Sequence, residues 1–380
     1  MGPTPAVAAV RRAVRGCVGD LGAGALVLTA CSGGADSLAL AAAVAFVAPR
    51  RGLRAGGVTV DHGLQPGSAE RAAAVAAELT RLGMDPVLSV PVAVGSAGGP
   101  EAAARAARYR ALATVAADTR AAAVLLGHTL DDQAETVLLG LARGSGPRSL
   151  AGMPASRGVF RRPLLGLRRP VTRAACADQG LRPWEDPHNR DRRFARARVR
   201  HEALPALEAA LGPGVAEALA RTAAQLHADA EFLESISAGC RAGSGPLAVA
   251  SLSGLPAAIR TRVLRDAAIA AGCPPGALTA RHVGWLEELI TGYRGQRWID
   301  LPGGVRAARR GGEVCFAAAQ SEHRPPAACA HSAAGDASLD DASPMEAPVR
   351  DERGADGRGG HGIGAQRGAD HRGTAAGADR

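Results

Sequence analysis

The segment SGGADS, residues 32–37, interrupts an apolar stretch that begins at Leu26. Its two glycines let backbone N–H groups curl around an anion without a Cβ in the way, and its serines add hydroxyl donors. A helix beginning near Ser37 would point its positive end at the same place. The carboxylate of Asp36 would repel a phosphate there unless a cation bridged the two, so the segment predicts a polyphosphate site with Mg²⁺.

A purely structural turn, or a phosphate loop of another type, would account for less of this segment. A strand-to-helix turn with serine at the N-cap would explain the glycines and serines, but not Asp36. A Walker A phosphate loop requires lysine after its last glycine, and the chain contains no lysine.

Two further segments carry polar groups suited to a nucleotide. His62, in VDHGL, follows an apolar run and would either contact the nucleotide or be satisfied by backbone groups alone. In EAAARAARYRAL, residues 101–112, Arg105 and Arg108 lie on roughly one helical face. These arginines would either form exposed pairs with acids or offset the charge of a departing pyrophosphate.

A second acidic segment, GHTLDDQAET at residues 127–136, follows another apolar run. Asp132 and Glu135 are three residues apart and therefore lie on one face of a helix. Acids in a first helical turn also stabilise the helix end, which is a sufficient explanation for Asp131. Two carboxylates on one face would hold a cation, either a metal ion or an amine substrate.

Residues 157–200 contain 13 arginines and four acidic residues. Four of these arginines surround Phe194, namely Arg193, Arg196, Arg198 and Arg200. Arginine interleaved with an aromatic side chain suits phosphate contact and base stacking, which predicts nucleic-acid binding. The simpler alternative is a solvated basic helix.

The elements that must position these groups follow an α/β pattern. Apolar runs at 25–31, 56–60, 87–92 and 122–127 alternate with alanine-rich segments of helical spacing at 37–48, 68–82 and 100–117. This alternation predicts a parallel sheet covered by helices. Ligands bind at the carboxyl ends of the strands in such sheets, and the polar segments follow directly after the apolar runs.

Three regions are predicted along the chain. Residues 1–200 would form the α/β domain. Residues 201–320 would form a smaller, mainly helical domain that ends in a short hairpin at 297–318. Residues 321–380 lack aromatic side chains and are rich in Gly, Ala, Asp and Pro, which predicts a disordered tail.

Composition narrows the cellular setting. The formal net charge of +9 and the pI near 10.1 favour a polyanionic partner. The seven cysteines form no CxxC pair, so neither a zinc site nor a disulfide framework is expected. No signal peptide and no apolar run long enough to span a membrane is evident, and a cytoplasmic location without membrane contact is predicted.

Residues 32–37, called the PP-loop below, resemble the SGGxDS signature of the PP-loop ATPases, the N-type ATP pyrophosphatases. A wider set of segments resembles the tRNA(Ile)-lysidine synthetase family: VDHGL, EAAARAARY, GHTLDDQAET, RGSG, RRPLL, WEDPHN and RRFARARVRHEALPALE. The resemblance is continuous over residues 20–210 and weaker to about 318. His188 and Ala197 depart from the family's pattern, in the segment expected to meet RNA.

The resemblance implies a Rossmann-like domain of the adenine nucleotide alpha hydrolase type and an ATP-dependent C–N ligase. ATP would adenylate the C2 oxygen of the wobble cytidine in the tRNA(Ile) with a CAU anticodon, and L-lysine would then replace AMP. A homodimer and tRNA binding by residues 201–320 are also implied. The alternatives are a PP-loop tRNA thiolase, a small-molecule amidating synthetase and a non-catalytic RNA-binding relic.

The resemblance also implies residue roles. ATP binding is implied for Ser32, Gly33, Gly34, Ala35, Asp36, Ser37 and His62, with Mg²⁺ at Asp36. Lysine binding is implied for Asp132 and Glu135, and catalytic roles for Asp36, Asp132 and Arg108. Binding of tRNA is implied for Arg193, Arg196, Arg198 and Arg200.

Overall fold

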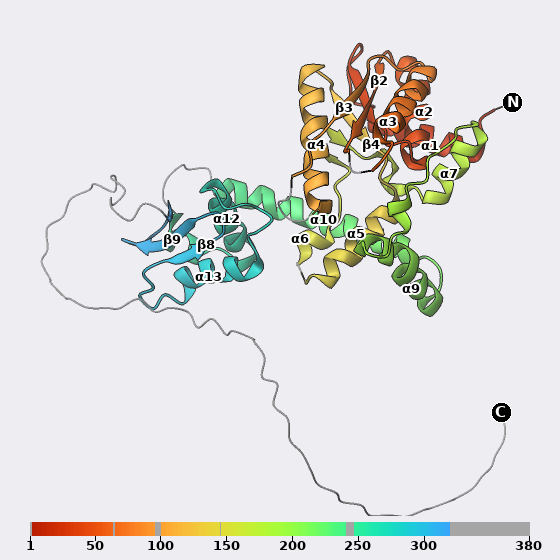
Figure 1. Ribbon diagram of the computed structural model, residues 1–380. Coiled ribbons are helices and arrows are strands. Elements are labelled where there is room, and N and C mark those ends of the chain that lie inside the picture. The colour runs from red at the N-terminus through yellow and green to blue at the C-terminus, as the bar shows by residue number, and fades with distance from the viewer. Residues whose placement is uncertain (1, 64, 96–99, 145, 241–246, 320–380) are drawn as a thin grey trace, which may run out of the picture. The chain divides into compact units, whose positions relative to one another are not determined.

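The computed structural model describes residues 2–63, 65–95, 100–144, 146–240 and 247–319 (Figure 1). All of these residues belong to one compact unit, Met1–Pro326. The predicted disordered tail at 321–380 lies outside the described residues. None of the described helices is long and apolar enough to cross a membrane.

The larger sheet has six strands in the order β3-β2-β1-β4-β6-β5. They are β1 (Leu26–Ala30), β2 (Arg54–Asp61), β3 (Val87–Pro91), β4 (Ala123–Leu126), β5 (Ser156–Arg157) and β6 (Phe160–Arg161). β1 lies at the centre, where Thr29 is in register with Gly57 on one side and Leu125 on the other. All neighbours are parallel except β5 and β6. The predicted parallel α/β sheet is therefore confirmed.

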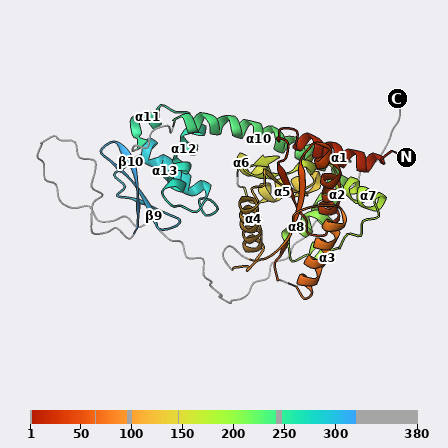
Figure 2. The same ribbon diagram turned by 90° about the horizontal axis from the view of Figure 1, so that it is seen from above.

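Helices cover both faces of this sheet, as Figure 1 shows for α1 and α4. The sheet-covering helices are α1 (Pro5–Cys17), α2 (Ala35–Arg50), α3 (Ser68–Arg81), α4 (Pro100–Asp118) and α7 (Arg169–Asp178). Val27 points into a core shared with α1, α2 and α7, whereas Leu28 points into a core shared with α4. This alternation follows from the period of two along a strand. α1 and α2 pack side by side (Figure 2).

Short elements connect the sheet to the helices that follow it. They are α5 (Leu130–Ala142), α6 (Pro147–Leu150), the short helix η1 (Pro163–Gly166), the turn η2 (Pro187–Arg190), α8 (Ala195–Arg198), the π-helical turn η3 (Val199–Ala203), α9 (Leu204–Leu211) and α10 (Val215–Cys240). Leu130 and Ala134 of α5 pack against Leu204 and Ala216, which ties α5 to α9 and α10.

A separate core forms toward the C-terminal end of the described chain. Its elements are β7 (Leu247–Ala248), α11 (Val249–Ser253), α12 (Ala257–Ala270), α13 (Ala280–Thr291), β8 (Ile299–Leu301), β9 (Val305–Arg310) and β10 (Glu313–Ala318). The strands form an antiparallel sheet in the order β7-β10-β9-β8. The expected hairpin is β9–β10, and β8 and β7 extend it on either side.

Candidate active site

The PP-loop makes a tight turn between β1 and α2. Gly33 has a φ of 84°, and a Cβ there would lie 2.8 Å from Val75 Cγ2, so both conformation and space require glycine. Ser37 Oγ donates to the Gly34 carbonyl at 2.9 Å and accepts from the Ser32 N–H at 3.2 Å. The turn therefore presents backbone N–H groups at a helix N-terminus, an arrangement that binds phosphate.

Asp36 follows Ala35, the first residue of α2, and its side chain turns toward α7. Its carboxylate accepts a short hydrogen bond from Thr172 and lies 3.6 Å from Arg169 Nε. Burial raises the pKa of Asp36, while the Thr172 hydroxyl opposes that rise. The charge of Asp36 therefore depends on cationic partners within this site.

The carboxyl end of β4 lies close to the PP-loop. A Cβ at Gly127 would lie 3.1 Å from backbone atoms of Asp36 and Ser37. α5 begins just beyond, after Thr129, whose N–H and hydroxyl donate to Asp132 Oδ2 at 2.8 and 2.9 Å. Asp132 thus closes a capping box on α5 with one oxygen and keeps the other for a cationic partner.

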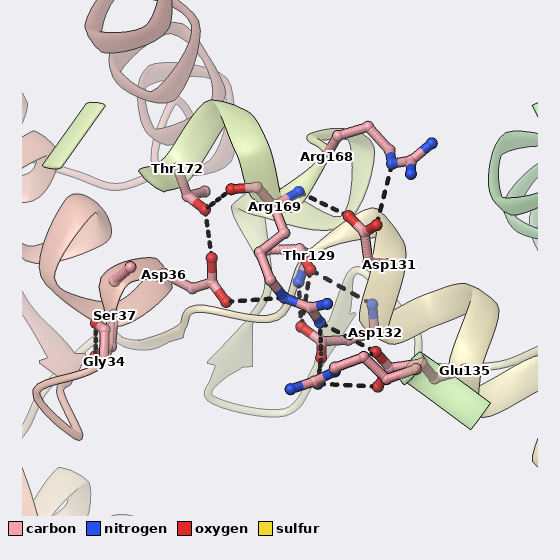
Figure 3. A network of polar contacts seen from close by, with 12 residues as sticks. Gly34, Asp36, Ser37, Thr129, Asp131, Asp132, Glu135, Arg168, Arg169 and Thr172 are labelled. Carbon is pink, nitrogen blue, oxygen red and sulfur yellow. Dashed lines mark hydrogen bonds and ion pairs between the residues drawn. The ribbon is translucent and has the colours of Figure 1, made fainter. Parts of the chain in front are cut away.

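Asp131 does not take the capping role expected of it. Its carboxylate accepts from Arg168 Nε at 3.1 Å and from the backbone N–H of Arg169 at 2.6 Å. Asp131 therefore fixes the start of α7 against α5, as Figure 3 shows.

Glu135 is fully buried one turn beyond Asp132. Its Oε1 accepts from Arg200 Nε at 2.8 Å and from Arg169 Nη2 at 3.2 Å. Arg196 Nε lies 3.5 Å from the other carboxylate oxygen. The two predicted lysine-binding carboxylates are thus brought together, and arginine side chains already contact them.

Arg169 joins this acidic pair to the PP-loop (Figure 3). Its Nη2 donates to Asp132 Oδ1 at 2.9 Å, and Arg200 Nη2 reaches the same oxygen at 3.2 Å. We call Asp36, Asp132, Glu135, Arg169, Arg196 and Arg200 the carboxylate–arginine cluster. Three acids and three arginines make it formally neutral, which is the condition for burying so many charges. Although burial opposes it, the charges of Asp132 and Glu135 raise the pKa of Arg169.

Basic groups with unsatisfied nitrogens lie beside the cluster. Among the described residues, His62 Nδ1, Arg108 Nε and His128 Nδ1 are buried atoms without a hydrogen-bond partner. Burial lowers the pKa of Arg108, and burial with the neighbouring charge of Arg108 lowers that of His62. Burial lowers the pKa of His128 to about 3, so its ring is neutral. Such unsatisfied donors suit an anionic or carbonyl-rich ligand.

Tyr109 holds two more arginines near these groups. Its hydroxyl accepts from Arg105 Nη2 at 3.3 Å and from Arg162 Nη2 at 3.2 Å. Although burial opposes it, the charge of Arg105 and the bond from Arg162 lower the pKa of Tyr109. Arg105 thus has an internal partner, a role not among those expected from the sequence.

The segment that contains Trp184 lies against the PP-loop. The Trp184 N–H donates to the Gly33 carbonyl at 2.9 Å, and the guanidinium of Arg71 lies 4.6 Å from the indole centroid. Gln65 donates to Asp186 Oδ1 at 3.1 Å. These contacts bring the β2–α3 connection and the WEDPHN segment together at the phosphate-binding turn.

The four arginines predicted to bind tRNA divide into two pairs. Arg196 and Arg200 belong to the carboxylate–arginine cluster. Arg193 is 83% exposed and pairs with Asp191 at 2.7 Å, and Arg198 donates to the carbonyls of Arg192 and Arg193. Their binding to RNA stays a prediction.

Arg169 and Thr172 are the site residues that the sequence did not single out. Both lie in the first turn of α7, and the sequence treats Arg169 as one of many arginines. The run RRPVT does contain a signal, since proline near a helix start fixes where that helix begins.

The PP-loop and its surroundings fit ATP and Mg²⁺. The glycine turn accommodates phosphate, and the buried nitrogens of Arg108 and His62 have no anionic partner among the described residues. Asp36 offers one carboxylate to a magnesium ion, whose remaining ligands would be phosphate oxygens and water.

Comparisons with known proteins agree with this geometry. Residues 9–207 match the family model described as "PP-loop domain", and residues 247–315 match "TilS substrate binding domain". The tRNA(Ile)-lysidine synthase of Thermobifida fusca is 61% identical over 321 residues, which cover 83% of this chain and 99% of that protein. The tRNA(Ile)-lysidine synthase of Streptomyces coelicolor is 55% identical, with the same coverage of 83% and 99%.

A solved structure shares the fold at much lower identity. It is the U34-tRNA thiolase NcsA from Methanococcus maripaludis with its [4Fe-4S] cluster, 18% identical with a TM-score of 0.50. The match covers 58% of this chain and 80% of the thiolase, and it bears on the fold alone. The sequence relatives are more specific, and they show that the chain belongs to the tRNA(Ile)-lysidine synthase family.

Proposed function

We propose that this protein ligates L-lysine to C2 of the wobble cytidine in the tRNA(Ile) with a CAU anticodon, with ATP as the activating substrate. Membership of the lysidine synthase family and the match to the PP-loop domain support ATP-dependent tRNA modification. The observation that carries the proposal is Arg169, which joins the phosphate-binding turn at Asp36 to the carboxylates Asp132 and Glu135. One side chain thus links the two half-sites that a two-step reaction requires.

In the first step, the C2 oxygen of cytidine attacks the α-phosphate of ATP and pyrophosphate leaves. The N–H groups and hydroxyls of the PP-loop would bind the departing pyrophosphate. Arg108, whose Nε has no partner in the described structure, would donate to the same developing charge. Mg²⁺ at Asp36 would neutralise phosphate charge, and Asp36 is the carboxylate of the PP-loop that would hold it.

In the second step, the lysine ε-amino nitrogen attacks C2, the bond from C2 to the adenylated oxygen breaks, and AMP leaves. Asp132 and Glu135 would bind ammonium groups of lysine. Guanidinium groups now contact these carboxylates, so lysine would enter by displacing or sharing the contacts of Arg200 and Arg169. The neutral charge of the cluster keeps both carboxylates ionised for that exchange.

A tRNA thiolase is the weaker alternative. The cysteines nearest the PP-loop are Cys31 and Cys176, and both thiols are buried. Burial raises the pKa of Cys31, and it raises that of Cys176 to about 11, which opposes thiolate chemistry at either residue.

Three further parts of the proposal come from the family resemblance. They are Mg²⁺ as the metal, a homodimeric assembly and a cytoplasmic location. The division into a domain at 1–200, a tRNA-binding domain at 201–320 and a tail also remains a prediction. Sedimentation of the purified protein would test the assembly directly.

The test of the proposed function measures AMP and pyrophosphate released from ATP with unmodified tRNA(Ile), with and without L-lysine. We expect AMP release to require both tRNA and lysine. AMP release that is indifferent to lysine would point to another nucleophile and contradict the proposal.

A further inference from the structure

A basic cavity lies beside the carboxylate–arginine cluster. It has a volume of about 480 Å³ and is lined by Arg173 of α7, Arg190 of η2, Arg192 and His201 of η3. No acidic residue lines it. None of these four residues was among those predicted to contact tRNA.

Two of the lining arginines carry weak partners. Arg190 pairs with Glu185 at 2.6 Å, with side chains 76% and 63% exposed, and Arg192 pairs with Glu202 at 3.1 Å, with side chains 78% and 45% exposed. Ion pairs this exposed contribute little, so both arginines can exchange their partner for a phosphate.

The other two lining residues are more available. Within the part of the chain that the structure describes, Arg173 forms no side-chain hydrogen bond or ion pair. The Nε2 atom of His201 lies 3.0 Å from the Asn189 carbonyl, which orients the ring and leaves Nδ1 for a ligand. A cavity with this lining attracts anions from solvent.

The chain ties this cavity to the reacting groups. Arg173 follows Thr172, which donates to Asp36, and His201 follows Arg200, which donates to Glu135. An anion held here would sit next to the residues proposed to act on cytidine and lysine. The PP-loop already supplies a phosphate site for ATP, so a second, solvent-open phosphate site suits the RNA backbone.

We propose that this cavity binds a phosphodiester group of the anticodon loop next to the wobble nucleotide, with Arg173 and His201 as its main ligands. The inference rests on the proposed function, because it assumes that the RNA substrate enters this site. Backbone contacts of this kind position the RNA without reading its sequence. The cavity would thus fix the register at which cytidine reaches the PP-loop.

The test compares Arg173→Gln and His201→Gln with Arg15→Gln, an exposed arginine of α1 that does not line the cavity. Fluorescence anisotropy would measure binding of an anticodon stem-loop RNA over a series of salt concentrations, and calorimetry would measure ATP binding. For Arg173→Gln we expect roughly tenfold weaker RNA binding and a salt slope smaller by about 0.7, the value for one lost phosphate contact on single-stranded RNA. We expect ATP affinity to be unchanged, KM for tRNA to rise and kcat to change little.

Two outcomes would overturn the inference. RNA affinity and salt slope equal to those of Arg15→Gln would mean that no phosphate binds there. Weaker ATP binding with normal RNA binding would assign the cavity to the nucleotide. Lysidine formation by the unaltered protein is scored separately, so that a failure of the proposed function is distinguishable from a failure of the subsite.

Discussion

Asp36 of the PP-loop and Asp132 of α5 are bridged by a single guanidinium group. Arg169 lies 3.6 Å from the first carboxylate and 2.9 Å from the second. The two segments are far apart in sequence, and each supplies one half of the proposed reaction. The bridge makes the charge state of one half-site depend on the other.

Replacement of Arg169 by Gln should therefore destabilise the fold as well as impair activity. It leaves Asp36, Asp132 and Glu135 with less positive charge in a buried setting, and we expect a loss of about 3 kcal/mol in the free energy of unfolding. Urea denaturation would measure it. Arg193→Gln is the matched control, because Arg193 is 83% exposed and outside the cluster. Equal stabilities of the two variants would contradict the bridging role.

Glu135→Gln should separate the two steps of the reaction. The amide keeps the volume of the side chain but loses the negative charge proposed to attract lysine. We expect KM for lysine to rise at least tenfold, while tRNA-dependent exchange of pyrophosphate into ATP persists. Asp131→Asn is the control on the same helix, since Asp131 contacts Arg168 and the Arg169 backbone rather than the acidic pair. Loss of exchange and of lysine use to the same extent would argue for a purely structural Glu135.

His128 should make the protein less stable in mild acid. Its pKa is lowered from the ordinary value of 6.5 to about 3 in the folded protein, so below pH 6.5 the unfolded chain binds a proton that the folded chain does not. Stability is therefore lost as the pH falls from about 6.5 toward 3. In His128→Gln this loss is absent, so the variant should gain relative to the original protein by up to about 1 kcal/mol per pH unit between pH 6 and 4. Parallel stability curves for the two proteins over this range would refute the assignment.

Gly33→Ala should abolish ATP binding. Alanine is strained at a φ of 84°, and its Cβ would lie 2.8 Å from Val75 Cγ2, so the loop must shift away from its phosphate-binding shape. Gly24→Ala is the matched control, because Gly24 has a φ of 78° but nothing within 4 Å of a Cβ. Calorimetry should show normal ATP affinity in the control alone, and ATP binding by Gly33→Ala would show that the loop geometry is not needed.

Much of the fold can be read from the sequence. β1 to β4 and the helices between them produce strong periodic patterns, because each strand has a buried face and each helix an apolar stripe. The β5–β6 pair and β7 have only two residues per strand, which is too short for any pattern to develop. Their pairing depends on tertiary packing.

The site can be read only in part. Glycine, serine and aspartate spacing reveals the PP-loop, since backbone geometry is local. The partners of Glu135 are arginines 34 and 65 residues away, and long arginine side chains give no sequence signal of where they end. Arg200 therefore looks like one more member of a basic segment, although its guanidinium lies on a buried carboxylate.

The most direct test of the central claim is the mass of the wobble nucleotide after reaction. Unmodified tRNA(Ile) would be incubated with ATP, L-lysine and the protein, then digested and analysed by mass spectrometry. The account predicts a wobble cytidine heavier by one lysine less one water, and no such product with Asp36→Asn. An unchanged cytidine, or a sulfur-containing product in its place, would contradict it.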